Sequence, residues 1–407
     1  MNKKIISIIS VVLIVLISLT SCGKTAEQKA AEETKKNIKV GIVLTGDEKD
    51  VYSNLHLTGF NAMKESVALK DDQIIIKKSI KAEDCYKTAA ELADSGCTVV
   101  FAAGDGIEDY IVQAATEKTG VQFCYADGKQ AFTSGVSNYH NYSVKTFEAR
   151  YLSGVATGMK LNDMIENGEI SESQTKLGYI GSTAGSASRS DYTAFYLGAK
   201  SVCKSVTMEV QYSGLNNSAN LERIAANALM ANGCIMIAQQ GYLNGAAETC
   251  EKNGKYFVGC DSSATDKAPN FAIASTTIDW TATYTYAVNT LISGQKLPSD
   301  WSKGSADDSI GITEINKVAF SAENKATAVT NKVNEIKTSL KDGKIKVFDN
   351  TKWTVNKEKV TTTVSDELNS MFSGKEYISK DGYFTECETS SYPQFNFVID
   401  GITELNA

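Results

Sequence analysis

The sequence predicts an α/β fold in which two doubly wound, Rossmann-like lobes face each other. Short apolar runs of strand length alternate with helical stretches from residue 38 onward, and the same order restarts near residue 176. In addition, ELADSGCTVVFAAG at 91–104 and ALMANGCIMIAQQG at 228–241 follow one pattern: the end of a helix, Gly-Cys, an apolar strand and a final Gly. Strand–helix–strand units of this kind form parallel sheets that helices cover on both faces.

The first series of elements accounts for one lobe. IKVGIVLT at 38–45 is a continuous apolar run typical of a buried strand. It is followed by a stretch in which Leu55, Phe60 and Val67 fall near one face of a helix. Strands are expected at 38–45, 73–80, 97–104 and 121–128, and helices at 51–68, 83–95 and 106–119. A long helix, expected at 143–161, follows this series.

The second series repeats this order and predicts a second lobe. Strands are expected at 176–182, 206–213, 234–241 and 256–262, and helices at 189–203, 218–232 and 243–253. The echoed units end in Asp127 and Asp261. Any two such units share glycines at helix ends and aspartates after strands, because turns favour these residues. The match in order over four elements nevertheless favours two true lobes.

The rest of the chain completes the two lobes and adds a tail. We expect a strand at 270–280, a helix at 281–293, loop and strand at 299–315, and an amphipathic helix at 323–341. The expected division is residues 38–140 with about 262–300 in the first lobe, and 141–261 with about 301–345 in the second. Residues 346–407 are aromatic and β-like in pattern, and are expected to pack on one lobe as an extension.

The N-terminus has the pattern of an export signal. Basic residues precede an apolar run from Ile5 to Leu19, which is too short for a comfortable membrane-spanning helix. Leu19-Thr20-Ser21-Cys22 resembles a bacterial lipobox, so residues 1–21 are expected to be removed and Cys22 to carry lipid. The alternative is a simple secretory signal with a chance cysteine. Residues 22–37 are small and charged, which predicts a tether between the anchor and the folded body.

Composition limits the classes of partner and site. The net charge of −7 argues against nucleic acid as a partner. The chain has nine cysteines but no Cys-x-x-Cys, and two histidines, which gives little support to a zinc site. Cysteines within apolar runs, such as Cys97 and Cys234, are expected to be small buried hydrophobes. The eight cysteines after Cys22 are either free thiols, as in a reducing habitat, or paired in disulfides.

Motifs for catalysis or cofactor binding are missing. Ligands of open parallel sheets bind beyond the carboxyl ends of the strands, so the segments directly after strands are the candidates. Among these, GDGIED at 104–109 lacks the third glycine of a dinucleotide fingerprint, and GSTAGSAS at 181–188 lacks the lysine of a phosphate loop. No nucleophile elbow with a plausible triad is visible. We therefore expect a binding protein with no catalytic residues, metal or cofactor.

Several motifs, taken in order, resemble one known family. DVYSNLHLTGFNAMKE at 50–65, VQFCYADG at 121–128, TFEARYLSGVATGM at 146–159, LGYIGS at 177–182 and FVGCDSS at 257–263 match motifs of the basic membrane protein family. This family comprises ABC-transporter solute receptors, including bacterial purine nucleoside receptors. The resemblance covers roughly residues 38–345. It implies a periplasmic-binding-protein type I fold, closure on a small solute, and ABC permease subunits as partners of a monomeric receptor.

The resemblance also implies a set of ligand-binding residues. In the family, aromatic rings stack on the base and carboxylates bind the ribose hydroxyls, which suits the chemistry of both groups. The expected ligand-binding residues are Asp50, Tyr52, Ser53, Gly104, Asp105, Asp127, Gly241, Tyr242, Asp261, Asp279 and Trp280. The last two directly follow Ile278, which stands where the family has a lysine. Tyr52 and Trp280 as packing residues, and Asp261 as a turn cap, are the alternative interpretations.

Together these observations predict a lipid-anchored receptor on the extracytoplasmic face of a bacterial cell membrane. It would bind a small polar solute between its lobes, with a nucleoside-like solute favoured, and would serve an ABC importer. Because the family lysine is absent, a sugar or a signal molecule read by a membrane sensor is the alternative. A surface enzyme that processes nucleosides is a further alternative, but it needs a base and a nucleophile that the sequence does not assemble near Asp127 and Asp261.

Overall fold

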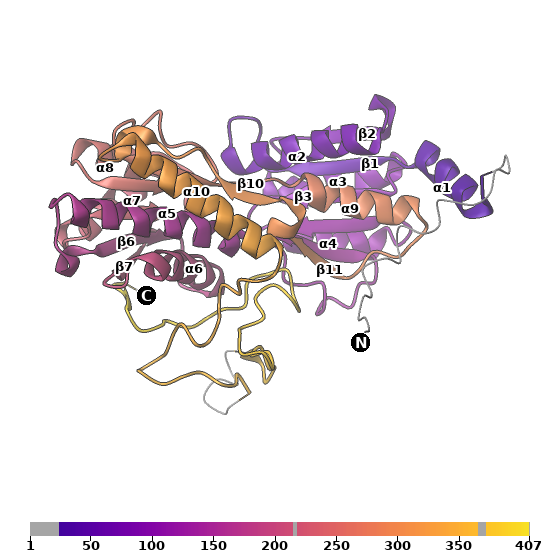
Figure 1. The fold of residues 1–407 in the computed structure, drawn as a ribbon. Coiled ribbons are helices and arrows are strands. Elements are labelled where there is room, and N and C mark those ends of the chain that lie inside the picture. The colour runs from indigo at the N-terminus through magenta and orange to yellow at the C-terminus, as the bar shows by residue number, and fades with distance from the viewer. Residues whose placement is uncertain (1–23, 215–217, 365–371, 407) are drawn as a thin grey trace, which may run out of the picture.

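Two largely parallel β-sheets, each with helices on both faces, form the body of the protein (Figure 1). The computed structural model describes residues 24–214, 218–364 and 372–406. Each sheet and its helices make one lobe, which confirms the predicted α/β architecture. The signal peptide expected at 1–21 and the lipidation site expected at Cys22 lie outside the described residues.

The sheet of the first lobe has six strands, all paired in parallel. Their order across the sheet is β11 (Asp300–Lys303), β5 (Tyr139–Val144), β4 (Gln122–Ala126), β3 (Val99–Ala103), β1 (Val40–Leu44) and β2 (Ile74–Lys77). One face is covered by α2 (Val51–Val67) and α9 (Thr281–Ile292), and the other by α3 (Cys85–Asp94) and α4 (Glu108–Glu117). Buried apolar residues on both faces explain the continuous apolar runs in the sequence.

The sheet of the second lobe has seven strands, of which β12 alone among the described strands pairs antiparallel. Their order is β12 (Ile310–Ile312), β10 (Ala272–Ile278), β9 (Tyr256–Gly259), β8 (Met236–Gln239), β6 (Lys176–Gly181), β7 (Thr207–Tyr212) and β13 (Ile402–Glu404). One face carries α5 (Thr146–Glu166), α6 (Ser186–Val202) and α10 (Glu323–Lys341), and the other α7 (Ala219–Ala231) and α8 (Gly245–Lys252).

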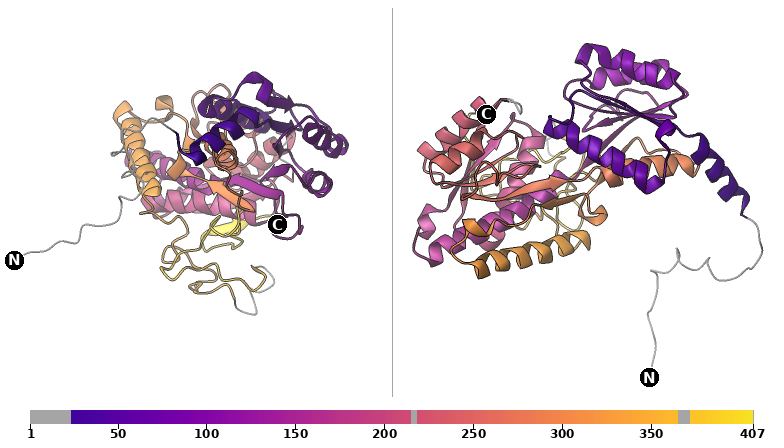
Figure 2. Two further views of the ribbon diagram at one scale, coloured as in Figure 1. Left: turned by 90° about the vertical axis from the view of Figure 1, so that its right-hand side faces the viewer. Right: turned by 90° about the horizontal axis from the view of Figure 1, so that it is seen from above.

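The chain crosses between the lobes after β5, after β10 and after β11 (Figure 2). The expected division was wrong for two strands. β10 was expected in the first lobe, but it pairs with β9 in the second, with Ala272 opposite Phe257. Most of β11 lies beyond residue 300 and was expected in the second lobe, but the strand pairs with β5 in the first, with Trp301 opposite Tyr142. The lobe to which a strand belongs depends on its pairing partners, which its own residues do not reveal.

Residues 22–37 were expected to be a tether, but the described part forms the helix α1 (Ala26–Asn37). Thr25 caps this helix, and its side chain and that of Gln28 form a capping box. Alanine, glutamate and lysine favour helix even without an apolar face, and α1 buries none of its residues. Its end is fixed to the first lobe because the amide of Gln73 donates to the carbonyls of Lys35 and Ile38.

The C-terminal segment, residues 348–406, is less regular than its aromatic pattern predicted. Within its described part, β13 and a few isolated bridges are the β-structure present. Its aromatic side chains instead make a cluster continuous with the core of the second lobe. Phe348 stacks on Phe395 at 4.3 Å between centroids, and Phe147 of α5 packs on Phe348. The expectation of a β-like extension was therefore wrong in secondary structure, because burial of aromatic rings accounts for the pattern.

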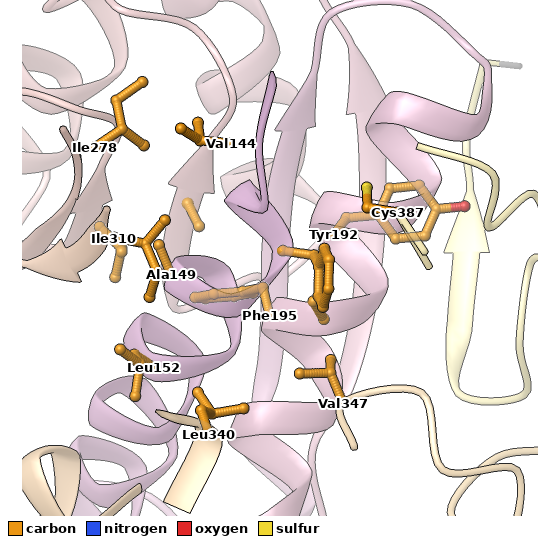
Figure 3. Packing of buried hydrophobic residues seen from close by; sticks show 14 of the residues in the cluster. Val144, Ala149, Leu152, Tyr192, Phe195, Ile278, Ile310, Leu340, Val347 and Cys387 are labelled. Carbon is orange, nitrogen blue, oxygen red and sulfur yellow. The ribbon is translucent and has the colours of Figure 1, made fainter. Parts of the chain in front are cut away.

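The core of the second lobe joins α5, α6, α10 and the C-terminal segment (Figure 3). Figure 3 shows Leu152 of α5, Phe195 of α6, Leu340 of α10 and Cys387 of the C-terminal segment within one packed cluster. All eight cysteines of the described residues are free and buried, and for those in apolar runs, such as Cys97 and Cys234, burial was expected. Over residues 24–214, 218–364 and 372–406, no helix combines the length and apolarity needed to cross a membrane.

Candidate functional site

A cleft of about 650 Å³ lies where the carboxyl ends of strands from both sheets face each other. The first lobe contributes Tyr52, the loop after β3, the end of β4, Lys129 and Ser143. The second lobe contributes residues 182–188, Asp191, Gln240 and Tyr242. Tyr392 and Pro393 of the C-terminal segment complete the lining. The site therefore lies at the strand ends where open parallel sheets bind ligands.

Asp127 is the central carboxylate of the first-lobe wall. It follows β4 with φ 54°, and its side chain accepts hydrogen bonds from the hydroxyls of Ser143 and Tyr52, the latter at 2.8 Å. Burial raises the pKa of Asp127 to about 6, although both hydroxyls oppose this shift. Burial and the carboxylate of Asp50 also raise the pKa of Asp105 in the same wall.

Asp191 is the matching carboxylate of the second-lobe wall, and Arg150 holds it from behind. Arg150 Nε lies 3.1 Å from Asp191 Oδ2, and the hydroxyl of Thr146 donates to Oδ1 at 2.8 Å. The remaining guanidinium nitrogens donate to the carbonyl of Gln239 and to the sulfur of Cys260. Burial raises the pKa of Asp191, and the guanidinium opposes that shift. Because both partners are buried, Arg150 fixes the orientation of this carboxylate.

Each lobe contributes one tyrosine ring to the lining of the cleft. The rings of Tyr52 and Tyr242 lie 6.1 Å apart between centroids and are tilted by 34°. Tyr52 is held in place by its hydrogen bond to Asp127 and by an edge contact with His56 at 4.6 Å. Flat apolar faces beside carboxylates suit a ligand that combines a ring with hydroxyl groups.

The loop 182–188 after β6 forms the floor of the second-lobe side. Gln240 Oε1 accepts from the backbone N–H and hydroxyl of Ser182 and from the hydroxyl of Ser188, at 2.7–3.2 Å. The loop leads into α6, so the N-terminus of a 17-residue helix faces the cleft. Helix N-termini attract oxygen-rich or anionic groups. The sequence signal here was the glycine- and serine-rich run, which lacked any phosphate-loop lysine.

Five predicted site residues line this cleft, and six do not. The five that the structure brings together are Tyr52, Gly104, Asp105, Asp127 and Tyr242. Asp50 caps α2 by accepting from the N–H of Ser53, whose hydroxyl in turn accepts from the N–H of Gly46. The carbonyl of Gly241 accepts from Gln239 inside the second lobe. These three residues therefore act on local structure.

Asp279 and Trp280 also have structural positions. Asp279 is exposed and accepts from the N–H of Thr281, the first residue of α9, at 2.8 Å. Trp280 is 1% exposed, and its ring stacks on that of His56 at 4.0 Å between centroids. Of the interpretations considered for Trp280, the core residue is the one that fits its position. The cleft thus has no counterpart of the family lysine at this place.

Asp261 is the structural echo of Asp127, but its side chain does not line the cleft. Both aspartates follow the fourth strand of their series and have φ 54°. Each accepts from a hydroxyl on the neighbouring strand, Ser143 for Asp127 and Thr276 for Asp261. Thr276 Oγ1 also accepts from the N–H of Asp261, so this aspartate closes a local turn. The repeated sequence therefore encodes a repeated turn, and one copy of it reaches the cleft.

The residues expected to bind the ligand left out several that line the cleft, namely Ser143, Asp191, Gln240, Glu108 and Lys129, and also Arg150 behind Asp191. Glu108, Lys129 and Asp191 lie in candidate segments after strands but were not singled out, because these side chains act through partners far away in the chain. Glu108 accepts from the N–H groups of Lys129 and Gln130 and shapes the rim of the cleft. Within the described residues, no cluster of three or more His, Cys, Asp or Glu side chains has the arrangement of a metal site.

One family model and several known proteins are similar to this chain. Residues 35–347 match the family model Bmp, described as ABC transporter substrate-binding protein PnrA-like. A putative ABC transporter glucose-binding protein of Haloferax volcanii is 25% identical over 53% of this chain and 52% of its own length. A purine-binding protein of Brucella abortus is 22% identical over 65% of this chain and 71% of its own length. The match thus spans about half of the first relative.

A solved structure shares the fold. The solute-binding protein of an ABC transporter system from Conexibacter woesei superimposes with a TM-score of 0.60 at 16% identity. The superposition covers 76% of this chain and 98% of that protein. The fold is the periplasmic-binding-protein type I fold, as the sequence motifs implied. The family works outside the cytoplasm and binds solutes for ABC transporters. Because the family model spans most of its length, the chain belongs to the Bmp family of PnrA-like ABC transporter substrate-binding proteins.

Proposed function

We propose that this protein is the receptor of an ABC importer for a nucleoside-like solute, which binds in the cleft between the lobes. Solute binding stabilises the closed arrangement of the lobes, and the permease subunits recognise that arrangement. The proposal adds a solute class to the family assignment and assigns no catalytic role to the cleft residues.

The observation that carries the proposal is the pairing of aromatic rings with carboxylates in the cleft. Tyr52 and Tyr242 line the cleft from opposite lobes, Asp127 accepts from the hydroxyl of Tyr52, and Asp191 lines the same cleft. A purine or pyrimidine base stacks favourably on tyrosine, and a carboxylate accepts hydrogen bonds from the hydroxyls of a ribose. The name of the Brucella abortus relative, a purine-binding protein, supports the same solute class.

A sugar is the second candidate solute. The name of the Haloferax volcanii relative favours it. The same tyrosines and carboxylates could hold a pyranose ring, and the cleft lacks the family lysine near Trp280 that would contact a purine. A nucleoside and a hexose differ in whether an aromatic base is present, so direct binding measurements separate them.

A solute screen tests this proposal. We expect adenosine, guanosine, inosine or uridine to raise the melting temperature of the soluble protein, residues 24–407, whereas D-glucose and L-amino acids leave it unchanged. A solute at 100 times its Kd stabilises by about 2.7 kcal/mol, which corresponds to roughly 3 °C for a protein of this size. A shift with D-glucose and with no nucleoside would falsify the nucleoside assignment and favour the sugar.

We further propose that lipid on Cys22 anchors the receptor to the extracytoplasmic face of the membrane. The lipobox-like Leu19-Thr20-Ser21-Cys22 supports this proposal. The full chain expressed in a bacterial host is expected to partition into the detergent phase of a Triton X-114 extract. Cys22→Ser is expected to partition into the aqueous phase or to keep its signal, because no acyl chain is added. If wild type and Cys22→Ser both lose the signal peptide and both partition into the aqueous phase, the N-terminus is a simple secretory signal.

A further inference from the structure

The C-terminal segment lies outside the region that the family model matches, which ends at residue 347. Its loop of residues 386–395, named here the C-terminal loop, nevertheless reaches the cleft through Tyr392 and Pro393. We propose that this loop is a third wall of the solute site and that Tyr392 contacts the bound solute and restricts its size. This inference rests on the proposed function in one respect: it requires that a solute binds in the cleft, whichever solute that is.

The C-terminal segment is anchored firmly to the second lobe. β13 pairs in parallel with β7 at the edge of the second sheet. Arg189 of α6 makes a bidentate ion pair with Glu404, with both N···O distances 3.0 Å, and also donates to Asn396 at 2.9 Å. Phe395 is fully buried against Phe348. These contacts attach the segment to the second lobe.

The C-terminal loop also contacts the first lobe. The N–H of Ser391 donates to Asp300 of β11 at 2.8 Å, and the hydroxyl of Ser302 donates to the carbonyl of Cys387 at 3.2 Å. The ammonium of Lys129, which follows β4, lies 4.2 Å from the centroid of the Tyr392 ring. The loop thus spans the cleft from the second lobe to the first, and Tyr392 lies where the two meet. In Figure 1 the segment, coloured yellow toward its end, passes along the lower side of the molecule.

Glu386 gives the C-terminal loop its shape. One oxygen of this buried carboxylate accepts from the N–H groups of both Gln394 and Phe395, at 2.9 and 2.8 Å. This ties the two ends of the loop together, and Tyr392 and Pro393 between them line the cleft. Burial raises the pKa of Glu386 to about 7, and the two backbone N–H groups oppose that shift. Glu386 does not line the cleft, so it is a positioning residue for Tyr392.

Affinity measurements with a matched control test the third wall. Calorimetric titrations of wild type, Tyr392→Ala and Tyr383→Ala would use adenosine, guanosine, inosine, uridine and D-glucose. Tyr383 belongs to the same segment and makes a similar cation–π contact, with Lys346, but lies outside the cleft. We expect Kd for the solute that binds wild type to rise at least tenfold in Tyr392→Ala and to stay within twofold in Tyr383→Ala. Equal Kd values in all three proteins would overturn the proposal.

Two variants of Glu386 test whether this residue acts by positioning Tyr392. Glu386→Ala is expected to raise Kd as Tyr392→Ala does, whereas Glu386→Gln keeps an acceptor oxygen for the two N–H groups and should restore wild-type affinity. Loss of affinity in Glu386→Ala with no rescue in Glu386→Gln would contradict the positioning role.

If none of these solutes binds wild type, the nucleoside and hexose assignments fail, and the third wall is tested without solute. Hydrogen–deuterium exchange is then measured on wild type and Tyr392→Ala. Faster exchange in residues 127–131, which face Tyr392 through Lys129, supports the wall. Unchanged exchange there rejects it.

Discussion

Arg150→Met is expected to destabilise the protein by about 3–5 kcal/mol at pH 7.5, because it leaves the Asp191 carboxylate buried without its ionic partner. The side chains of Arg150 and Asp191 are 4% and 5% exposed, so water cannot replace the lost guanidinium. Methionine retains most of the buried apolar volume, which isolates the electrostatic effect. Urea denaturation at constant protein concentration measures the change.

The pH dependence of this loss gives an internal check. Burial already raises the pKa of Asp191, and removal of Arg150 removes the group that opposes this shift. A carboxyl whose folded-state pKa is raised favours the folded state below its unfolded pKa and loses that advantage as the pH rises. The deficit of Arg150→Met should therefore be smaller at pH 5 than at pH 8. Adding Asp191→Asn should recover at least half of it, and an equal deficit in the double variant would contradict the assignment.

Asp127→Asn is expected to weaken solute binding at least 100-fold, because the amide lacks the charge that strengthens hydrogen bonds to solute hydroxyls. A 100-fold loss corresponds to about 2.7 kcal/mol. Asp50→Asn is the control, since Asp50 is exposed and caps α2 outside the cleft. Calorimetric titration with the solute found in the screen measures both. Unchanged affinity in Asp127→Asn would show that this carboxylate has a structural role alone.

The same variant is expected to be more stable than wild type in the absence of solute. The pKa of Asp127 is raised to about 6, so ionising this partly buried group in wild type costs free energy above that pH. The stability that Asp127 contributes is fully present below its unfolded pKa near 4 and is lost as the pH rises through 6. Asp127→Asn should therefore gain about 1–3 kcal/mol at pH 7.5 and little at pH 4.5. Thermal melts at the two pH values show whether binding function is retained at the expense of stability.

Much of the fold could be predicted because the signals are local. Apolar runs of strand length and helices with one apolar face indicated most elements of both lobes, and their order indicated the architecture. β5 was missed because its residues are partly polar although the strand is buried. His140, Asn141 and Ser143 are satisfied by the carbonyl of Pro298, the N–H of Ala131 and the carboxylate of Asp127. Such distant partners leave no periodic pattern in the strand itself.

The candidate site was less predictable because most of its side chains are placed by partners that are distant in the chain. Tyr52 and Asp127 follow strand ends, which is a local property, and the structure brings them together. Asp261 has the same local sequence and backbone conformation, but its side chain closes a turn with Thr276. Arg150 acts on groups 41 to 110 positions away in the chain. Tyr392 reaches the cleft through a loop that the family model does not cover.

The free, buried cysteines have a practical consequence for measuring solute binding. Burial raises the pKa of Cys85 and Cys97 to about 11 and of Cys234 and Cys250 to about 12, so these thiols react slowly at neutral pH. A soluble protein that begins at residue 24 would therefore give a low background with maleimide dyes. One cysteine introduced on an exposed surface of each lobe could then carry a donor and an acceptor fluorophore. Energy transfer between them would report lobe closure, and the receptor would serve as its own optical sensor.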